Sequence, residues 1–488
     1  MKSFYLSIDV GASSGRLIVT IKDKNKLEFV EIYRFKNSLY EKEGTLFWNF
    51  KFLFENITAG IGIAFKKYPK IKAIGIDTWG VDYGLIDSEG NLLKDPVSYR
   101  DSRGRTVEAS VFEVINKNKL YQKTGIQHLH FNTIFQLVYD AKYNQALFKK
   151  ACKMLMMPDL LAYFLTGEKR IEITNLSTTS LYDLKSKTLI SELEDLGIPS
   201  EIFPEIIYPG EKYGVLKEKI ASLLGVPRVP VVAVCSHDTA SAILSIPYRE
   251  KHVYISSGTW SLCGTTLAKP LTNDAAYSSN YTNGIGFNNS IMFLKNIMGL
   301  WIVNECKKEW EKEGRNYEFS DLAILASASL PFQSFIDPDD YLFEQPGEMP
   351  DKIRLYCKRT GQIVPETVGE IVLCIYQSLA FKYRYTIEKL EEIVKEKFER
   401  IVIVGGGTNI DLLNRMTASA ANKQVLLGSN EATVLGNALV LMWYSKDIAS
   451  IEEGKEIIQN FVGRKIYYPV KTEEYERNYR NFKNLIKG

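Results

Sequence analysis

The stretch "SIDVGASSGRLIVT", residues 7–20, decides the fold class. A turn rich in Gly and Ser is typical of a phosphate site, but the P-loop and the dinucleotide loop both lead from a strand into a helix. Here Gly15 and Arg16 lead into Leu-Ile-Val-Thr-Ile, a run that predicts a second strand. The sequence therefore predicts a β-hairpin whose turn holds an anion through backbone N–H groups.

A second stretch, "HVYISSGTWSLCGTTL" at 252–267, repeats this strand–turn–strand design. Gly258 stands about half the chain beyond Gly11 and Gly15. Since each hairpin opens an alternation of strand-like and helix-like segments, we predict a duplicated α/β unit. We expect an N-terminal domain at 1–247 and a C-terminal domain at 248–488, which share one cleft.

The second half also shows helix patterns. Apolar residues at helical spacing predict a long helix over about 366–397. The stretch "FLKNIMGLWIVNECKKEW", 293–310, is expected to open a helix, and a last helix is expected to start near Glu431.

Composition excludes several classes of protein. The 488 residues are 45% hydrophobic, which suits two or three globular domains, and the net charge of +3 argues against nucleic acid as a partner. The opening Met-Lys-Ser-Phe enters a strand at once and no apolar run could span a membrane, so we expect a soluble, cytoplasmic protein. The six cysteines form no C-x-x-C pair, and Cys357 and Cys374 are expected to be buried free thiols.

The stretch "SHDTAS" places Asp238 after a buried strand, where open α/β sheets bind ligands. Its carboxylate there could accept a proton from a substrate hydroxyl, although Ser and Asp are also good helix caps. In the opening hairpin, Asp9 could hold Mg²⁺ through water while Gly11 to Gly15 wrap phosphate oxygens. The alternative for that turn is an ordinary hairpin.

Two further glycine positions favour ligand binding. Gly80, in "DTWGVD", interrupts a strand and suggests close backbone approach, whereas Trp79 is expected in the core. The triple glycine of "IVIVGGGTN" has no acidic residue about 20 positions on, which argues against NAD and favours a purine-nucleotide site. The single Gly-Lys pair continues with Glu, so a P-loop is absent.

These stretches together resemble the FGGY carbohydrate kinases along nearly the whole chain. The resemblance includes "DVGASSGR", "IGIDTWGVD", "YRDSRG", "FNTIFQL", "MMPDLLAYFLTG", "VPVVAVCSHDTASA", "SSGTWSL", "LKNIMGLW", "FIDPDD" and "VGGGTN...LLN". Three of the stretches, "GASSGR", "SHDTAS" and "KNIMGLW", resemble the branch of the family that acts on L-rhamnulose.

The resemblance implies an actin/hexokinase-like (ribonuclease H-like) ATPase fold, with two α/β domains around a cleft. It implies that the γ-phosphate of ATP is transferred, with Mg²⁺, to the 1-hydroxyl of L-rhamnulose; the alternative is another ketose such as L-fuculose or xylulose. Asp238 matches the proton acceptor of the family. The substrate contacts match Gly80, His237, Thr239 and Asn296, and the ATP contacts match Ala12, Ser13, Ser14, Gly15, Arg16, Thr259, Asn304 and Gly406.

The chain departs from the family pattern at a few positions. Asn409-Ile410 follows the triple glycine where relatives carry Gln-Asn, Asn304 stands in place of a longer Gln, and "YTNGIG" replaces a commoner Thr-Asn-Glu. Two alternatives from other classes remain. A sugar-sensing regulator would need a DNA-binding helix-turn-helix, and a chaperone-type ATPase would act through protein partners. We expect small-molecule partners only, in a monomer or homodimer.

Overall fold

The structure is a computed structural model that describes residues 2–463 and 465–486. The chain forms two compact units, each considered by itself. Unit 1 comprises Met1–Pro247, Thr266–Phe293 and Ala432–Phe461; unit 2 comprises Tyr248–Thr265, Leu294–Glu431 and Val462–Gly488. Two segments of the expected C-terminal domain therefore belong, by their contacts, to unit 1.

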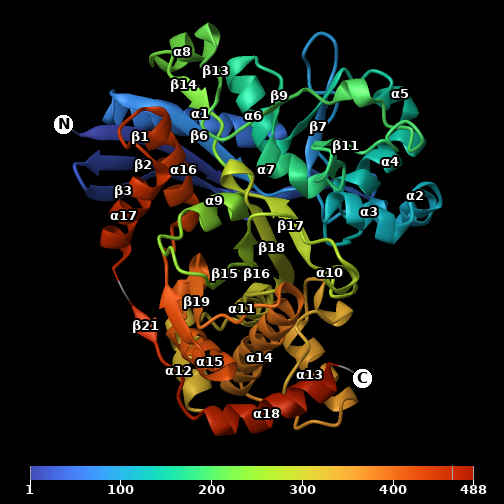
Figure 1. Cartoon of the computed structure of the whole chain (residues 1–488), viewed down its shortest axis with the longest axis vertical. Helices are drawn as coiled ribbons and strands as arrows, with labels where there is room; N and C mark the ends of the chain where they lie inside the picture. The colour runs from blue at the N-terminus through green and yellow to red at the C-terminus, as the bar shows by residue number, and fades with distance from the viewer. Residues whose placement is uncertain (1, 464, 487–488) are drawn as a thin grey trace. The chain divides into compact units, whose positions relative to one another are not determined.

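Unit 1 is built on a six-stranded sheet with the order β13-β14-β6-β1-β2-β3 (Figure 1). The predicted first hairpin is confirmed, because β1 and β2 pair antiparallel, and β6 then lies parallel to β1. The strands are β1 Ser3–Val10, β2 Ser14–Asp23, β3 Lys26–Lys36, β6 Ile71–Thr78, β13 Lys212–Val215 and β14 Pro230–Val232.

The helices of unit 1 cover this sheet and the region beyond it. They are α1 Phe50–Lys67, α2 Glu108–Val114, α3 Lys117–Thr124, α4 Thr133–Tyr143, α5 Gln145–Phe148, α6 Met157–Thr166, α7 Ile173–Leu176, α8 Glu218–Leu224, α9 Asp238–Leu244, α10 Asp274–Ser278, α16 Ala432–Tyr444 and α17 Ile451–Val462. Short strands complete the unit: β4 Leu39–Lys42, β5 Thr45–Trp48, β7 Tyr83–Ile86, β8 Lys153–Met156, β9 Arg170–Glu172, β10 Tyr182–Asp183, β11 Thr188–Leu189, β12 Glu205–Ile207 and β17 Thr282–Ile285.

The alternation of side chains along β1 and β6 assigns each face of the sheet a role. Leu6, Ile8 and Val10 point into the core cluster that α1 and α6 complete. Because successive residues of a strand point to opposite faces, Asp9 and Asp77 lie on the other face, where α16 packs. The register of β1 and β6 therefore places both carboxylates on the same face of the sheet.

Unit 2 repeats the design around a seven-stranded sheet with the order β17-β18-β16-β15-β19-β20-β21. The second predicted hairpin is confirmed: β15 pairs antiparallel with β16 and parallel with β19. Its strands are β15 Val253–Ser257, β16 Trp260–Leu267, β18 Ile291–Met298, β19 Arg400–Val404, β20 Gln424–Leu427 and β21 Ile466–Tyr467. Its helices are α11 Trp301–Lys312, α12 Phe319–Ser327, α13 Met349–Arg359, α14 Val368–Val394, α15 Asp411–Ala421 and α18 Thr472–Leu485.

Two of the expected helices are corrected by the structure. The stretch 293–310 opens as a strand, since β18 continues to Met298 and α11 begins only at Trp301. Six of the eight residues of β18 are buried, on both faces, so its sequence lacks the alternation that marks a strand. A helix does start next to Glu431, but it is not the last, because α17 and α18 follow. The long helix is confirmed as α14.

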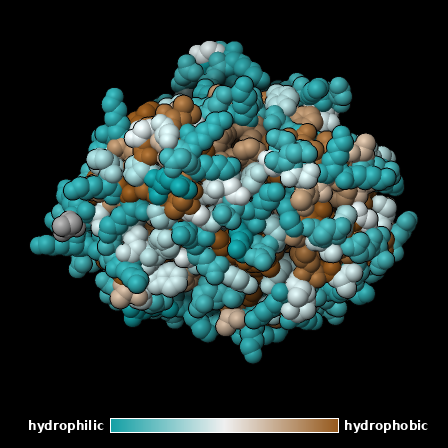
Figure 2. Space-filling model, turned by 90° about the horizontal axis from the view of Figure 1, so that it is seen from above, coloured by the Kyte–Doolittle hydropathy of each residue, from teal (hydrophilic) through white to brown (hydrophobic). Residues whose placement is uncertain are grey.

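The surface in Figure 2 is mainly hydrophilic, with hydrophobic residues in separate patches. No helix within residues 2–463 and 465–486 is both long and apolar enough to cross a membrane. Cys357 and Cys374 are both buried and free.

Candidate active site

Three carboxylates gather at the carboxyl ends of the central strands of unit 1. Asp9 lies next to the last residue of β1, in parallel register with Asp77 near the end of β6. The next residue of β6, Thr78, donates its backbone N–H to the carbonyl of Ser236 at 2.9 Å, so the "SHDTAS" segment runs beside this strand end. Asp238 therefore lies close to the two strand carboxylates, and the charges of Asp9 and Asp238 both act on Asp77.

The turn of the first hairpin lies next to Asp9. The Gly11 N–H donates to the Ser14 carbonyl at 2.9 Å and closes the turn, and Arg16 on β2 pairs with Asp9 across the hairpin. The Arg16 guanidinium lies 2.5 Å from the Asp9 carboxylate. At Gly15 a Cβ atom would lie only 2.1 Å from the Phe35 ring, so this position requires glycine. The turn thus offers backbone N–H groups and one cation beside a carboxylate.

Asp238 is the first residue of α9, and its side chain remains 38% exposed. Its Oδ1 accepts hydrogen bonds from the Thr239 N–H at 2.5 Å and the Thr239 hydroxyl at 3.1 Å. Burial raises the pKa of Asp238 and the charge of Asp9 raises it further, although His237 lowers it. Asp238 is therefore a reachable carboxylate that binds a proton more readily than a solvated one.

His237 stands beside this carboxylate as a neutral group, because burial lowers the pKa of its imidazole. Its Nε2 lies 3.5 Å from Asp238, and its buried Nδ1 has no hydrogen-bond partner in the described part of the chain. Buried ring nitrogens normally have a partner, so Nδ1 is an unsatisfied polar atom, while Nε2 is the ring nitrogen that faces the carboxylate.

Glu172 holds the segment that contains Ser236 and His237, and it was not identified from the sequence. Its carboxylate, fully buried, accepts the Ser236 hydroxyl at 2.6 Å and the Ser236 N–H at 3.2 Å, and it caps α7. Thr174 in that helix accepts the His237 N–H at 3.2 Å. The only signal in the sequence was a charged residue between apolar neighbours in "RIEITN", which gives no hint of a partner 64 residues away.

Contrary to the prediction from the sequence, Gly80 does not interrupt a strand, because β6 ends at Thr78; it opens a loop that is held in a rare backbone conformation. Val81 has φ of 68°, which is strained for a β-branched residue. Its N–H donates to the Thr178 hydroxyl at 3.1 Å, and its carbonyl accepts the Thr133 hydroxyl at 2.7 Å. A Cβ atom at Gly80 would lie 3.0 Å from Thr178, so the glycine permits this close approach.

Asp82 anchors the same loop from the core. Its carboxylate accepts the indole N–H groups of Trp48 at 2.7 Å and Trp79 at 2.9 Å, so Trp79 is a core residue as expected. The Gln136 amide donates to the other Asp82 oxygen at 3.1 Å. Burial raises the pKa of Asp82 to about 6, although these donors lower it.

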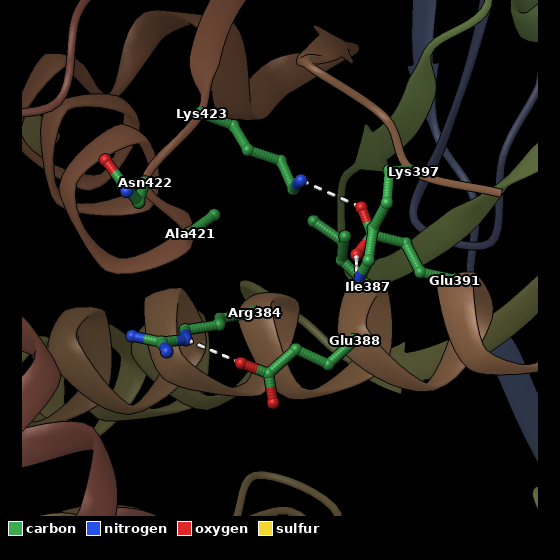
Figure 3. Close-up of a pocket in the computed structure, with 8 residues that line it drawn as sticks. All are labelled: Arg384, Ile387, Glu388, Glu391, Lys397, Ala421, Asn422 and Lys423. Atoms are coloured by element: carbon green, nitrogen blue, oxygen red, sulfur yellow. Dashed lines mark hydrogen bonds and ion pairs between the residues drawn. The ribbon is translucent and has the colours of Figure 1, made fainter.

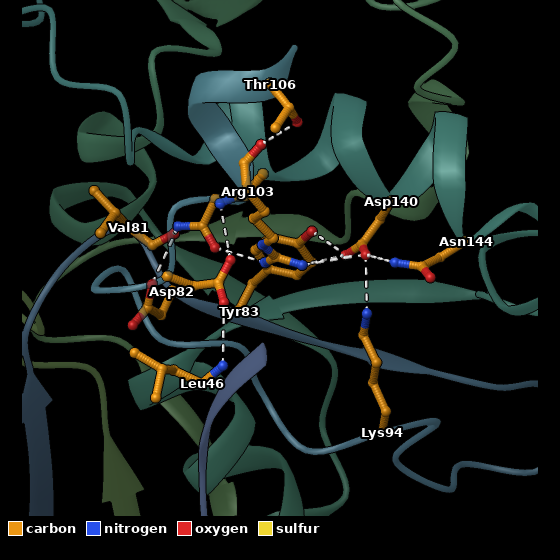
Figure 4. A network of polar contacts seen from close by, with 11 residues as sticks. Leu46, Val81, Asp82, Tyr83, Lys94, Arg103, Thr106, Asp140 and Asn144 are labelled. Carbon is orange, nitrogen blue, oxygen red and sulfur yellow. Dashed lines mark hydrogen bonds and ion pairs between the residues drawn. The ribbon is translucent and has the colours of Figure 1, made fainter. Parts of the chain in front are cut away.

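Behind this loop lies a buried ion pair (Figure 4). Arg103 contacts both oxygens of Asp140 at 3.2 Å and donates to the side-chain amide oxygen of Gln136 at 2.7 Å. Asp140 also accepts the Tyr83 hydroxyl at 2.6 Å and the Lys94 ammonium at 2.9 Å. Gln136 therefore connects the ion pair to Asp82.

Unit 2 brings together two of the predicted nucleotide positions. Thr259 lies at the tip of the second hairpin, where its carbonyl accepts the N–H groups of Gly299 and Trp301, both at 3.1 Å. Gly406 is exposed at the end of β19, and the adjacent Gly407 packs so closely on Ser257 that a Cβ would lie 2.1 Å from its hydroxyl. The turn that contains Gly406 and the hairpin turn that contains Thr259 therefore both lie at the end of β15, next to Ser257.

Asn296 and Asn304 have different settings in unit 2. Asn296 lies half-buried within β18, so it is not a helix cap. Asn304 lies half-buried in the first turn of α11, close in sequence to the Gly299–Leu300 turn that meets the hairpin tip. Both positions are near the segment that supports Thr259, and their contacts with a ligand stay predictions.

A separate pocket of about 280 Å³ in unit 2 contains none of the predicted residues (Figure 3). It is lined mainly by paired charges: Arg384 donates to Glu388 at 2.8 Å, and Lys423 to Glu391 at 2.8 Å. Since these charged side chains pair with one another, the pocket is not a better candidate for the active site than the strand ends of unit 1. Within the described ranges, no group of three or more His, Cys, Asp and Glu side chains could hold a metal ion.

The comparison with known proteins bears on this geometry. Residues 4–245 match the N-terminal domain of the FGGY family of carbohydrate kinases, and residues 253–445 match its C-terminal domain. The chain belongs to this family. It is 41% identical to a rhamnulokinase of Ligilactobacillus salivarius (strain UCC118), over 99% of both chains. It is 36% identical to a rhamnulokinase of Bacteroides thetaiotaomicron, over 100% of both chains.

Solved structures show the same fold at low sequence identity. The chain matches a ligand-bound xylulose kinase from Lactobacillus acidophilus with a TM-score of 0.81 and 16% identity, over 99% of this chain and 98% of that one. Plasmodium falciparum glycerol kinase with ADP matches with a TM-score of 0.79 and 15% identity, over 99% and 98% of the two chains. The predicted fold class is confirmed, and this FGGY family member is a carbohydrate kinase.

Proposed function

We propose that this carbohydrate kinase transfers the γ-phosphate of ATP to the 1-hydroxyl of L-rhamnulose. The observation that carries the proposal is the position of Asp238, a half-exposed carboxylate beside the Asp9–Arg16 hairpin. The substrate follows from the relatives, since the full-length matches at 36–41% identity described above are named rhamnulokinase. Another ketose, such as L-fuculose or xylulose, is the alternative.

Asp238 is proposed to align the sugar hydroxyl and accept its proton, a step worth about 10²–10⁴-fold in rate. His237 would contact the sugar beside Asp238, on the side of its Nε2, and Thr239 would hold the carboxylate in place. Gly80 would bring backbone close to the sugar, and Asn296 would supply a further contact. Phosphoryl transfer needs positioning and charge stabilisation more than covalent chemistry, which suits these groups.

The phosphates of ATP are assigned to the opening turn. Its N–H groups from Ala12 to Gly15 and the Arg16 guanidinium would hold phosphate oxygens. Mg²⁺ keeps several waters and takes few protein carboxylates, so Asp9 and Asp77 would suffice to hold it, and one oxygen of Asp77 is buried without a partner among the described residues. Asp9 would hold Mg²⁺ through water, and the ion would neutralise charge on the transferred group.

The remaining nucleotide contacts are assigned to unit 2. Thr259 would bind a phosphate, and Gly406 would let the backbone approach the nucleotide, with Asn304 adding a polar contact. We further propose that the protein acts in the cytoplasm as a monomer or homodimer, with small molecules and no nucleic acid as its partners.

The first test is the release of ADP from ATP and Mg²⁺ with L-rhamnulose, L-fuculose, D-xylulose, L-ribulose and glycerol, beside a control without sugar. L-Rhamnulose is expected to give a kcat/KM at least about tenfold above the others, since a methyl-sized difference is worth about 1–3 kcal/mol. If another ketose is preferred, the substrate assignment is wrong. ADP release that ignores every sugar would contradict the kinase mechanism itself.

The pH profile provides a second test of Asp238. A general base must be ionised in the free enzyme, so kcat/KM for the ketose should fall in acid. Because the pKa of Asp238 is raised above its usual 3.8, the midpoint of this acid limb should lie above that value. The measurement is kcat/KM between pH 4 and 8 at saturating Mg·ATP, in a range where circular dichroism shows an intact fold. A midpoint at or below 3.8 would count against Asp238 as the base.

A further inference from the structure

Asp77 is held by a contact that the mechanism above does not use. It is fully buried on β6, in register with Asp9; its Oδ2 accepts a hydrogen bond from the side-chain amide of Asn437, and its Oδ1 has no partner among residues 2–463 and 465–486. Asn437 lies on α16, 360 residues further along the chain. Its amide therefore decides which oxygen of Asp77 turns towards α16 and which turns away.

The same amide is tied to the helix that carries Asp238. The Ser241 hydroxyl, three residues after Asp238 on α9, lies 2.9 Å from the Asn437 carbonyl oxygen and 3.1 Å from the Thr433 carbonyl. At Gly436 a Cβ atom would lie 1.9 Å from the Ser241 carbonyl, so α16 and α9 meet backbone to backbone. This close contact fixes the position of Asn437 along α16 relative to Ser241 on α9.

A packing role alone does not account for Asn437. The other buried residues of α16 are Ala, Val, Leu, Met and Gly, and leucine would fill the same volume. A buried amide bonded to a carboxylate brings desolvation costs that an apolar pair avoids. What the amide adds is a defined direction for Asp77 and a polar link from β6 to α9.

We propose that Asn437 is a positioning residue for phosphoryl transfer, which orients Asp77 on β6 and, through Ser241, holds α9 so that Asp238 stays aligned with the strand-end carboxylates. This inference rests on the proposed role of Asp238. It assigns Asn437 no contact with substrate; the residue acts through Asp77 and Ser241. Displacements of about 1 Å in such an arrangement can cost about 10²-fold in rate.

The test begins with Asn437→Leu, which keeps the volume and removes both hydrogen bonds. We expect kcat to fall at least about 30-fold, while KM for the ketose and for ATP changes less than about threefold, because the binding groups are elsewhere. A kcat close to that of the unchanged enzyme would overturn the proposal. A loss of kcat could also come from a less stable protein with a lower Tm. The next variant distinguishes that loss from a loss of positioning.

The double variant Asp77→Asn with Asn437→Asp restores an acid–amide pair but moves the carboxylate from β6 to α16. We expect its Tm to recover towards that of the unchanged protein while kcat stays low. Recovery of kcat together with Tm would show a purely structural pair and overturn the inference.

A milder matched pair covers the case in which those variants fail to fold. Ser241→Ala removes the link to Asn437, whereas Ser245→Ala, one turn further along the chain and just past the end of α9, removes only a hydroxyl bonded to the Ala242 carbonyl. We expect kcat to fall about three- to tenfold in the first and to stay unchanged in the second. Equal kcat values would contradict the proposal. Should Asp238→Asn itself remain active, the proposed function fails instead, so the two failures are distinguishable.

Discussion

Replacing Asp238 by asparagine is expected to lower kcat by about 10²–10⁴-fold while the affinity for ATP changes little. Asparagine keeps the size of the side chain and an oxygen that can accept the Thr239 hydroxyl, but it cannot take a proton from the sugar. The phosphate contacts proposed for the opening turn do not involve residue 238, so ATP binding should persist. Steady-state ADP release and calorimetric titration with a non-hydrolysable ATP analogue measure the two quantities.

Asp274→Asn is the matched control for this substitution. Asp274 is also the first residue of a short helix, α10, but it is exposed and belongs to no proposed site. We expect its kcat and Tm to match those of the unchanged protein. If Asp238→Asn keeps near-normal turnover, Asp238 is not the proton acceptor, whatever the sugar proves to be.

Much of this site was open to prediction from the sequence, for local reasons. The two hairpins follow from glycine turns between β-branched runs, and the place of Asp238 follows from a polar segment after a buried strand. Each of these signals lies within about ten residues. The resemblance to a family added roles for positions such as Asn296 and Asn304, which no pattern alone would assign.

What could not be predicted depends on partners that are distant in the chain. In the sequence Asp77 is an ordinary polar residue at a strand end, and only the structure shows its hydrogen bond with Asn437. Glu172 likewise gains its role only through Ser236. The strand β18 was expected to be helical because burial on both faces erases the alternation, and the tertiary setting alone decides such a segment.

Replacing Arg103 by methionine is expected to reduce the free energy of unfolding by about 3–5 kcal/mol, because it leaves the fully buried Asp140 without the cation that contacts both of its carboxylate oxygens. Burial opposes ionisation of Asp140, but Arg103 and Lys94 outweigh it and hold its pKa below the usual value. A lowered pKa gives stability that is present at neutral pH and lost as pH falls through the pKa of the folded protein. The loss caused by Arg103→Met should therefore be largest near pH 7–8 and shrink in acid.

Urea unfolding of both proteins at several pH values, followed by tryptophan fluorescence, measures this difference. Adding Asp140→Leu to Arg103→Met should recover much of the lost stability, since a buried charge pair can be replaced by apolar groups at little cost. Arg354→Met is the control: Arg354 pairs with a largely exposed Asp351, and such pairs are worth about 0–1 kcal/mol. Equal losses for Arg103→Met and Arg354→Met would contradict the buried network of Figure 4. Because Gln136 links Arg103 to Asp82 and to the strained Val81, the KM for the ketose should rise in Arg103→Met and remain normal in the control.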